Sequence, residues 1–437
     1  MKKIKILISP EAWYFYFVFS GAIELITDGV DLTLPLLVIS LLSALPRLRR
    51  YPRIPKMMIL PLVLYGLLSI LMVSSNFYSA SSSYGMDKTL RFISLTAWAF
   101  VAPVILLNNK ESIEKFLGAG IFAAAFVSVL SLFEYSSMNY TATTIYTEQV
   151  RIGNDNAIGL ARFAGTGAIL IIIFWITANN RFKIIGLALL IACLSSLFLT
   201  GSRMPLLSFL IVFLLICSFS FIFTKKGLVI NKNIRLLLTL FLLGIVFVSS
   251  QWNSTNFYMM RLRLEGLLGV NGGSLDASSS ERLNRFSVAF EMFKENLLLG
   301  GGVGSFSTFY EDIDARSYPH NIFLELVSEL GMVGLFIFIL MLMLVIPAFA
   351  TVYRKGKLTA SQLSVSALFL YAIINANATG DLNDNRILFA FMSICYMLPL
   401  YRGIKDSVNE STKQKKNQKM IRMGLPIAVR NQMKMKT

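Results

Sequence analysis

Residues 321–352 read NIFLELVSELGMVGLFIFILMLMLVIPAFATV, an apolar run that is longer than one membrane crossing requires. As a single helix it would reach about 48 Å, whereas the hydrocarbon core of a bilayer is about 30 Å thick. Its first turns are therefore expected to stand above the hydrocarbon or to line a water-filled hollow. Glu325 and Glu329 lie four apart on one helix face, which favours the hollow. Gly331 and Gly334 allow close helix packing or a kink.

Comparable apolar segments recur along the whole chain. Hydrophobic residues make up 55% of the sequence and the mean hydropathy is +0.64, which excludes an ordinary soluble domain. The sequence therefore predicts an all-α, polytopic membrane bundle of about twelve transmembrane helices. The predicted spans are residues 8–27, 30–46, 57–76, 90–108, 114–133, 156–178, 184–200, 204–223, 235–250, 322–352, 360–378 and 386–401.

These segments divide the chain into four parts. Residues 1–250 hold the first nine predicted helices, and 251–321 form a long external loop with an amphipathic helix near 281–297. Residues 322–401 hold the last three predicted helices, and 402–437 form a basic tail. The first span follows a basic start but lacks a small-residue cleavage site, so we interpret it as a retained helix.

The charges orient this bundle. Most basic residues fall at the chain start, in alternate turns and in the tail, which the positive-inside rule places in the cytoplasm with both termini. This topology, with attraction to anionic lipids, accounts for the net charge of +17. Nucleic-acid binding would require stacking aromatics among the basic residues, and the tail segment 413–419 has none. No nucleic-acid partner is expected.

Cysteines and glycines give no sign of a cofactor. Cys193, Cys217 and Cys395 all lie in predicted spans, which argues against a disulfide framework or a zinc site. The run Gly300-Gly-Gly-Val-Gly304 fits neither nucleotide fingerprint. It is interpreted as a flexible turn, with the alternative that its backbone amides help to hold a phosphate.

The external loop contains a predicted amphipathic helix. Ser278-Ser-Ser-Glu281 makes a capping box that is expected to start it. Apolar residues then recur at spacings of three and four, which predicts one apolar stripe lying on the outer leaflet or over the mouth of the bundle. The stripe consists of Leu283, Phe286, Phe290, Phe293 and Leu297.

One histidine and four arginines form the candidate site. His320 is the only histidine in the chain, and it falls where the external loop meets the apolar run. Its imidazole suits proton transfer near neutral pH. Arg151, Arg203, Arg282 and Arg285 lie on the same predicted side, and arginine forks bind phosphate oxygens bidentately. Each arginine taken singly could instead anchor a lipid headgroup.

The chain resembles the O-antigen polymerase and ligase superfamily of bacterial membrane glycosyltransferases, the Wzy and WaaL proteins. The matching pieces are the loop from Arg151 to Asn156, Thr200-Gly-Ser-Arg203, the segment from Ser280 to Phe306, and Pro319-His-Asn-Ile-Phe-Leu-Glu325 with its continuation to Gly334. This resemblance implies a C-type glycosyltransferase (GT-C) architecture and a metal-independent enzyme without cofactors. It implies a donor glycan on undecaprenyl diphosphate, used on the periplasmic face of the inner membrane.

The resemblance also implies roles for particular residues. Arg203 and Arg282 would hold the diphosphate and His320 would be the general base, with Tyr318, Asn321 and Glu325 of the same motif in support. The likeness favours a polymerase, whose acceptor is another lipid-linked repeat unit. The alternative is a ligase, whose acceptor is lipid A-core. A chain-length regulator would be a further partner. A lipid-linked oligosaccharide transporter is an alternative of another class.

Overall fold

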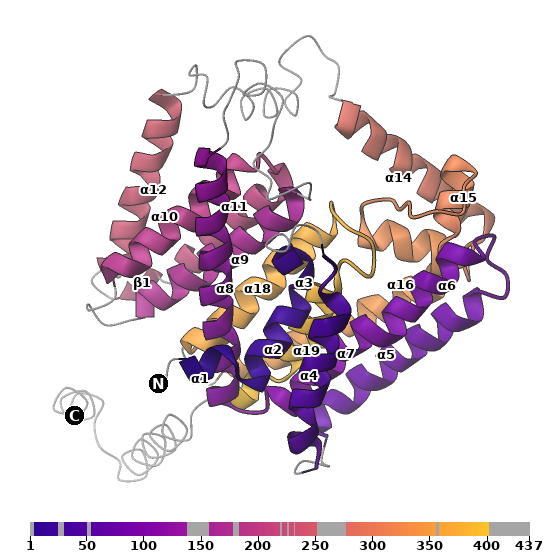
Figure 1. Cartoon of the computed structure of the whole chain (residues 1–437), viewed down its shortest axis with the longest axis horizontal. Coiled ribbons are helices and arrows are strands. Elements are labelled where there is room, and N and C mark those ends of the chain that lie inside the picture. Colours follow the sequence, from indigo (N-terminus) through magenta and orange to yellow (C-terminus); the bar gives the residue numbers. More distant parts are fainter. Residues whose placement is uncertain are drawn as a thin grey trace.

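The computed structural model describes residues 4–24, 30–49, 54–137, 157–177, 183–218, 221–224, 227–230, 232–250, 277–354 and 358–401. Arg151, the tail 402–437 and residues 251–276 of the external loop lie outside this described part. Within it the protein is a bundle of helices (Figure 1). The one departure in the described part is an antiparallel hairpin of β1 (Phe221–Thr224) and β2 (Gly227–Ile230).

Each predicted apolar segment contains at least one described helix. In the first half of the chain these are α1 (Ile4–Leu7), α2 (Pro10–Val18), α3 (Ser20–Ile23), α4 (Thr33–Leu48), α5 (Lys56–Ser75), α6 (Ser83–Arg91), the π-helical turn η2 (Phe92–Thr96), α7 (Ala97–Leu106), α8 (Lys110–Ser137), α9 (Ala157–Thr177), α10 (Lys183–Leu199) and α11 (Arg203–Ser218). The second half has α12 (Lys232–Ser250), α14 (Ala277–Glu295), α15 (Ser305–Glu311), α16 (Ile322–Met343), α17 (Val345–Arg354), α18 (Ala360–Ala376), α19 (Arg386–Tyr396) and the 3₁₀ turn η5 (Leu398–Tyr401).

Among the described residues, five helical stretches are long and apolar enough to cross a membrane: Lys56–Ser75, Ser83–Leu106, Lys110–Glu134, Ala157–Ile176 and Ile322–Arg354. Shorter apolar helices accompany them, among them α4, α10, α11, α18 and α19. The chain is therefore a multi-pass membrane protein. The full count of about twelve crossings remains a prediction.

The first predicted span is not one helix, and this part of the prediction was wrong. Ser9 accepts a hydrogen bond from Ala12 N at the start of α2, and Pro10 occupies the first turn, so a new helix begins there. Phe19 leaves helical geometry and separates α2 from α3. This break places α3 and the residue after it, Glu24, in the wall of a polar cavity.

Helix α9 lies at the centre of one half of the bundle and packs against α8, α10, α11 and α18. Small residues allow this close approach, because a side chain at Gly167 would meet Ala124 of α8. Ala161, Ala164 and Ala168 are fully buried. A helix covered on all sides in this way can hold a charged side chain away from lipid, and Arg162 occupies such a position.

The long apolar run is broken at Gly331, which has φ 63° and ψ −163° inside α16. The break frees backbone groups that the preceding segment satisfies. Gly301 N and Gly302 N donate to the carbonyls of Ser328 and Glu329, each at 2.9 Å. Met332 N and Val333 N donate to Leu297 O and Leu298 O. The predicted kink is confirmed, and the glycine run pairs with the broken helix, as non-helical backbone within a membrane must.

We predict that Gly331→Ala destabilises the protein by at least about 1–3 kcal/mol. The backbone there is left-handed, and an added Cβ would press against the Leu298 carbonyl. The measurement is thermal unfolding in detergent. Gly66→Ala in α5 is the matched control, since nothing lies within 4 Å of a Cβ at that position. Equal unfolding temperatures for the two variants would contradict the prediction.

The predicted amphipathic helix is present as α14, which begins at Ala277, before the predicted capping box. Its buried face is not the predicted stripe. Ala289 and Met292 are buried against Phe306 of α15, whereas Leu283 and Phe290 are about half exposed. The reason is that α14 packs on α15 and α16 through its smaller residues. The large apolar side chains are left on the outer face, where lipid can cover them.

Candidate functional site

A polar cavity of about 390 Å³ lies among the ends of several helices. Its walls come from α2, α3, α9, α19, the loop after α15 and the loop between α18 and α19. Both apolar and charged side chains line it, a composition that is typical of ligand-binding sites. The lining residues are Val18, Phe19, Gly21, Ala22, Glu24, Ile158, Gly159, Arg162, Phe163, Arg316, Tyr318, His320, Thr379, Gly380, Asp384, Arg386 and Ile387.

His320 lines this cavity at the entrance to α16. Its backbone is left-handed, with φ 60°, an unusual conformation for a residue with a side chain. The Tyr318 ring packs edge-on against the imidazole at 4.5 Å between centroids. Asn321 then caps α16 by accepting hydrogen bonds from Phe323 N and Leu324 N. Tyr318 thus contacts the imidazole of the predicted base, and Asn321 caps the helix that follows it.

The surroundings of His320 keep its imidazole neutral. Burial, together with the positive charges of Arg282 and Arg285 on α14, lowers the pKa of His320 to about 4. No described residue hydrogen-bonds the ring. The nitrogen lone pair is therefore available to a ligand proton over the whole neutral range.

We predict that the activity depends on pH through this depressed pKa. A base must be unprotonated, so the rate should fall on the acid side near pH 4 rather than near 6.5. Arg282→Gln removes a charge that disfavours the imidazolium, so the acid limb should move to higher pH. Lys294→Gln on the same helix is the matched control. An unmoved acid limb in Arg282→Gln would contradict the prediction.

Three arginines surround the same cavity. Arg162 Nη2 donates to Asn385 Oδ1 at 2.8 Å, and Arg386 Nη2 donates to Ser20 Oγ at 2.6 Å. Both therefore bind neutral acceptors through these nitrogens. An anion entering the cavity would meet guanidinium groups that protein contacts already orient, an arrangement suited to phosphate oxygens.

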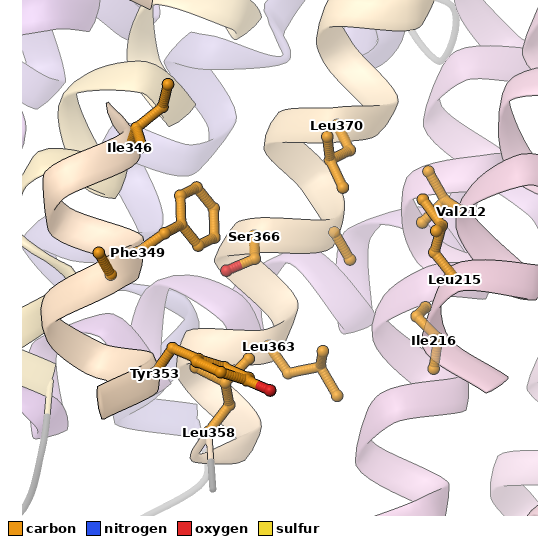
Figure 2. A pocket seen from close by; sticks show the side chains of 12 residues that line it. Val212, Leu215, Ile216, Ile346, Phe349, Tyr353, Leu358, Leu363, Ser366 and Leu370 are labelled. Atoms are coloured by element: carbon orange, nitrogen blue, oxygen red, sulfur yellow. The ribbon is translucent and has the colours of Figure 1, made fainter. Parts of the chain in front are cut away.

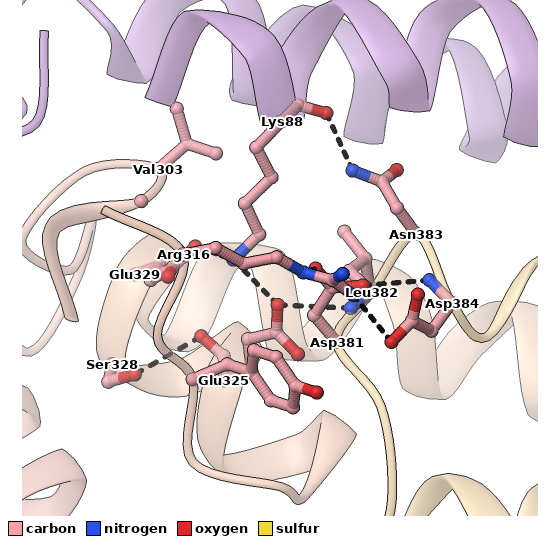
Figure 3. Close-up of polar contacts among 12 residues, drawn as sticks. Lys88, Val303, Arg316, Glu325, Ser328, Glu329, Asp381, Leu382, Asn383 and Asp384 are labelled. Carbon is pink, nitrogen blue, oxygen red and sulfur yellow. Dashed lines mark hydrogen bonds and ion pairs between the residues drawn. The ribbon is translucent and has the colours of Figure 1, made fainter. Parts of the chain in front are cut away.

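Arg316, the third, is held by two carboxylates of the loop between α18 and α19. Its Nη2 lies 2.7 Å from Asp384 Oδ2, and its Nε lies 3.4 Å from Asp381 Oδ2. The guanidinium also covers the Tyr318 ring at 5.5 Å. Figure 3 shows Arg316 reaching across to Asp381 and Asp384. This loop thereby fixes a cation on the wall opposite α9.

The predicted arginines occupy different positions. Arg285 Nη1 donates to Ser317 Oγ at 2.6 Å and to the Tyr318 carbonyl at 3.2 Å, so it braces the segment before His320. Arg282 lies close enough to influence the charge of His320. Arg203 is the first residue of α11 and is not in the cavity wall. Arg151 lies outside the described residues. Diphosphate binding by these four arginines stays a prediction.

The comparison with known families agrees with this geometry. Residues 188–339 match the family model described as O-antigen ligase, a range that includes α14, Arg316 and His320. Over this range, which is less than half of the chain, the protein is similar to the O-antigen ligase family. No curated protein sequence matches the chain.

Members of this family are glycosyltransferase-type membrane enzymes of lipopolysaccharide biosynthesis. Several residues of the cavity wall in the present chain were not predicted from the sequence. Arg162 carried a clear signal, because an arginine within an apolar span marks a functional site by default. Asp384 and Arg386 lie in a polar cluster at the start of the last predicted span, and no role was predicted for either residue.

Glu325, predicted to support the site from a water-filled hollow, is instead buried in an ion pair. Lys88 of α6 lies 2.6 Å from Glu325 and 2.6 Å from Glu329. The prediction of a water-filled hollow on this face of the helix was wrong, because the buried ammonium group of Lys88 occupies the space. The signal missed was Lys88 itself, a lysine within the stretch Ser83–Leu106 that could span the membrane.

A second cavity in the described part of the protein is apolar. It measures about 330 Å³ and lies between α11, α17 and α18 (Figure 2). Its walls include Val212, Phe349 and Leu370, and Ser366 brings one hydroxyl toward it. Such a lining suits a hydrocarbon chain and offers no ionisable group for glycosyl transfer other than the Tyr353 phenol.

Proposed function

We propose that the protein is a polysaccharide polymerase that joins undecaprenyl-diphosphate-linked oligosaccharide repeat units by inverting glycosyl transfer. The observation that carries the proposal is the cavity in which His320 shares the walls with Arg162, Arg316 and Arg386. A proton acceptor and three guanidinium groups in one cavity match the two demands of the reaction. A hydroxyl must lose a proton, and a diphosphate must leave.

His320 is the general base in this proposal. A sugar hydroxyl is a weak nucleophile, and removing its proton during attack contributes about 10²–10⁴ in rate. The His320 imidazole is neutral at physiological pH and therefore ready to accept this proton. Attack on the anomeric carbon from the face opposite the diphosphate inverts that centre. The C–O bond to the diphosphate breaks as the new glycosidic bond forms.

Arginines stabilise the departing diphosphate. Negative charge grows on its oxygens in the transition state, and cations that are already in place stabilise it without reorganisation. Arg162, Arg316 and Arg386 surround the cavity, and Arg282 and Arg285 lie on the neighbouring helix α14. Arg203, which the family likeness implies together with Arg282, and Arg151 complete the proposed set. The activated donor bond supplies the free energy, so neither ATP nor a metal ion is required in this scheme.

The proposed setting is the bacterial inner membrane, with both termini in the cytoplasm and the cavity facing the periplasm. The basic turns support this orientation. The exposed apolar face of α14 would lie at the outer leaflet, close to where a lipid-linked donor presents its diphosphate. The remaining proposed partners are a glycan acceptor, the surrounding lipids and a chain-length regulator.

A ligase is the second candidate, and a specific observation favours it. The family model that matches residues 188–339 is described as O-antigen ligase. A ligase would use the same base and the same diphosphate site, and only the acceptor would be lipid A-core. The residues of the cavity wall do not distinguish these two acceptors, because both present sugar hydroxyls.

The test uses purified protein in detergent with undecaprenyl-diphosphate-linked repeat units and EDTA, with the products separated on a gel. A ladder of longer lipid-linked chains is expected for a polymerase. No ladder, followed by sugar transfer once lipid A-core is added, would identify a ligase. If neither product forms, both assignments are refuted and transport is favoured. A ladder that forms only when EDTA is left out would refute metal independence.

A further inference from the structure

Lys88 is an ammonium group buried within the bundle. Its side chain is 0% exposed, and its Nζ lies 2.6 Å from Glu325 Oε1 and 2.6 Å from Glu329 Oε2. Both carboxylates are also buried, with at most 3% of either side chain exposed. Figure 3 shows Lys88 extending from α6 toward the two glutamates of α16. One cation thus holds two successive turns of a single helix.

Stability does not explain this arrangement. A buried ion pair recovers at best about what it loses in desolvation, and apolar residues of similar volume often serve stability as well. Within the described part of the chain nothing hydrogen-bonds Glu325 Oε2 or Glu329 Oε1, although both atoms are buried. Two carboxyl groups thus share one ammonium group. The arrangement fixes geometry at a cost in free energy.

The geometry concerned is that of a half-helix. The break at Gly331 separates Ile322–Leu330 from the rest of α16, so the helix below cannot hold this half-helix by continuity alone. Its place depends on contacts with its neighbours. Lys88 supplies two of them, and Glu325 Oε1 adds a third by accepting a hydrogen bond from Leu382 N at 3.0 Å.

His320 lies directly before this half-helix. Asn321 caps its first turn, so His320 and the half-helix form one rigid segment. Glu325 lies on its first turn and Glu329 on its second. A shift of α6 relative to α16 would therefore move the imidazole within the cavity. A misplacement of about 1 Å at a reacting group can lower a rate about 10²-fold.

We propose that Lys88 is a positioning residue for His320. By holding Glu325 and Glu329, it fixes the half-helix and with it the distance between the imidazole and the bound acceptor hydroxyl. This inference rests on the proposed function, in which His320 is the base. It assigns to α6 a part in catalysis although Lys88 does not line the cavity.

The test is a double-mutant cycle in the purified full-length protein with the lipid-linked donor. Lys88→Met alone would leave two unpaired buried charges, so the principal variant is the neutral triple substitution Lys88→Met, Glu325→Gln, Glu329→Gln. The glutamine at 325 keeps an acceptor for Leu382 N. Arg91→Gln is the matched control, because Arg91 lies on the same helix and pairs at the surface with Asp87.

The triple variant is expected to fold and to lose about 10²-fold in kcat, with KM for the donor within about twofold of the parent value. Introduced into His320→Asn, the same triple change should cause no further loss, because its effect passes through the imidazole. A folded triple variant with normal kcat, or an equal loss in both backgrounds, would overturn the inference. Full activity of His320→Asn would refute the base assignment itself, which is a separate failure.

Discussion

Replacing His320 is expected to lower the rate of chain formation by about 10²- to 10⁴-fold without loss of folded protein. The reason is the loss of the only imidazole, which lies in a polar cavity among three guanidinium groups. The arginines are protonated and cannot take a proton from the acceptor hydroxyl. The cavity carboxylates Glu24 and Asp384 already accept hydrogen bonds from Thr33 and Arg316. The residual rate should reflect diphosphate stabilisation alone.

The choice of replacement matters because the backbone at position 320 is left-handed. His320→Asn is the preferred variant, since asparagine tolerates this conformation and cannot act as a base. His320→Ala removes the base and adds backbone strain. Both variants should be equally inactive in the gel assay, whereas only His320→Ala should unfold at a lower temperature. An active His320→Asn would end the proposal that His320 is the base.

Arg162→Gln is expected to lower kcat/KM for the lipid-linked donor by about 10²–10³-fold. Arg162 of α9 lines the cavity, and its Nη2 donates a hydrogen bond to the neutral Asn385 side chain. Its positive charge is therefore directed to the cavity rather than neutralised by a carboxylate within hydrogen-bonding distance. Glutamine keeps a polar amide but is shorter and removes the charge. The measurement is initial rate against donor concentration.

Two further variants make this second test specific. Arg162→Lys keeps the charge but loses the planar fork, so it should recover only part of the rate. Arg91→Gln removes an exposed arginine that pairs with Asp87 and should leave kcat/KM unchanged. A normal kcat/KM in folded Arg162→Gln would remove Arg162 from the diphosphate site and leave the role to the other arginines.

Much of the fold was visible in the sequence because a membrane restricts the available structures. The apolar runs predicted helices in the correct places, and Gly331 marked a kink that the structure confirms. The amphipathic helix was also predicted, since a period of three and four requires only local information. The buried face of this helix was not predicted. Ala289 and Met292 are buried because α14 packs there against α15 and α16. That information is not local.

The site was predicted in part for the same reason. His320, Tyr318 and Asn321 form one continuous motif, so their proximity followed from the sequence. Arg162 and Arg386 come from helices far apart in the chain, and only packing brings them to the cavity of His320. Pairings of this kind depend on tertiary contacts that a single sequence does not contain. The ion pairs of Lys88 are a further example.

The order of residues in the ion network bears on how the protein is made. Lys88 lies far upstream of Glu325 and Glu329, so during synthesis α6 emerges from the ribosome long before α16. When the two glutamates reach the insertion machinery, their counter-ion is already in the bilayer. Two carboxylates near the start of an apolar segment would otherwise make its insertion costly. The lysine is therefore synthesised before the two glutamates, so both can pair with it as their own helix inserts.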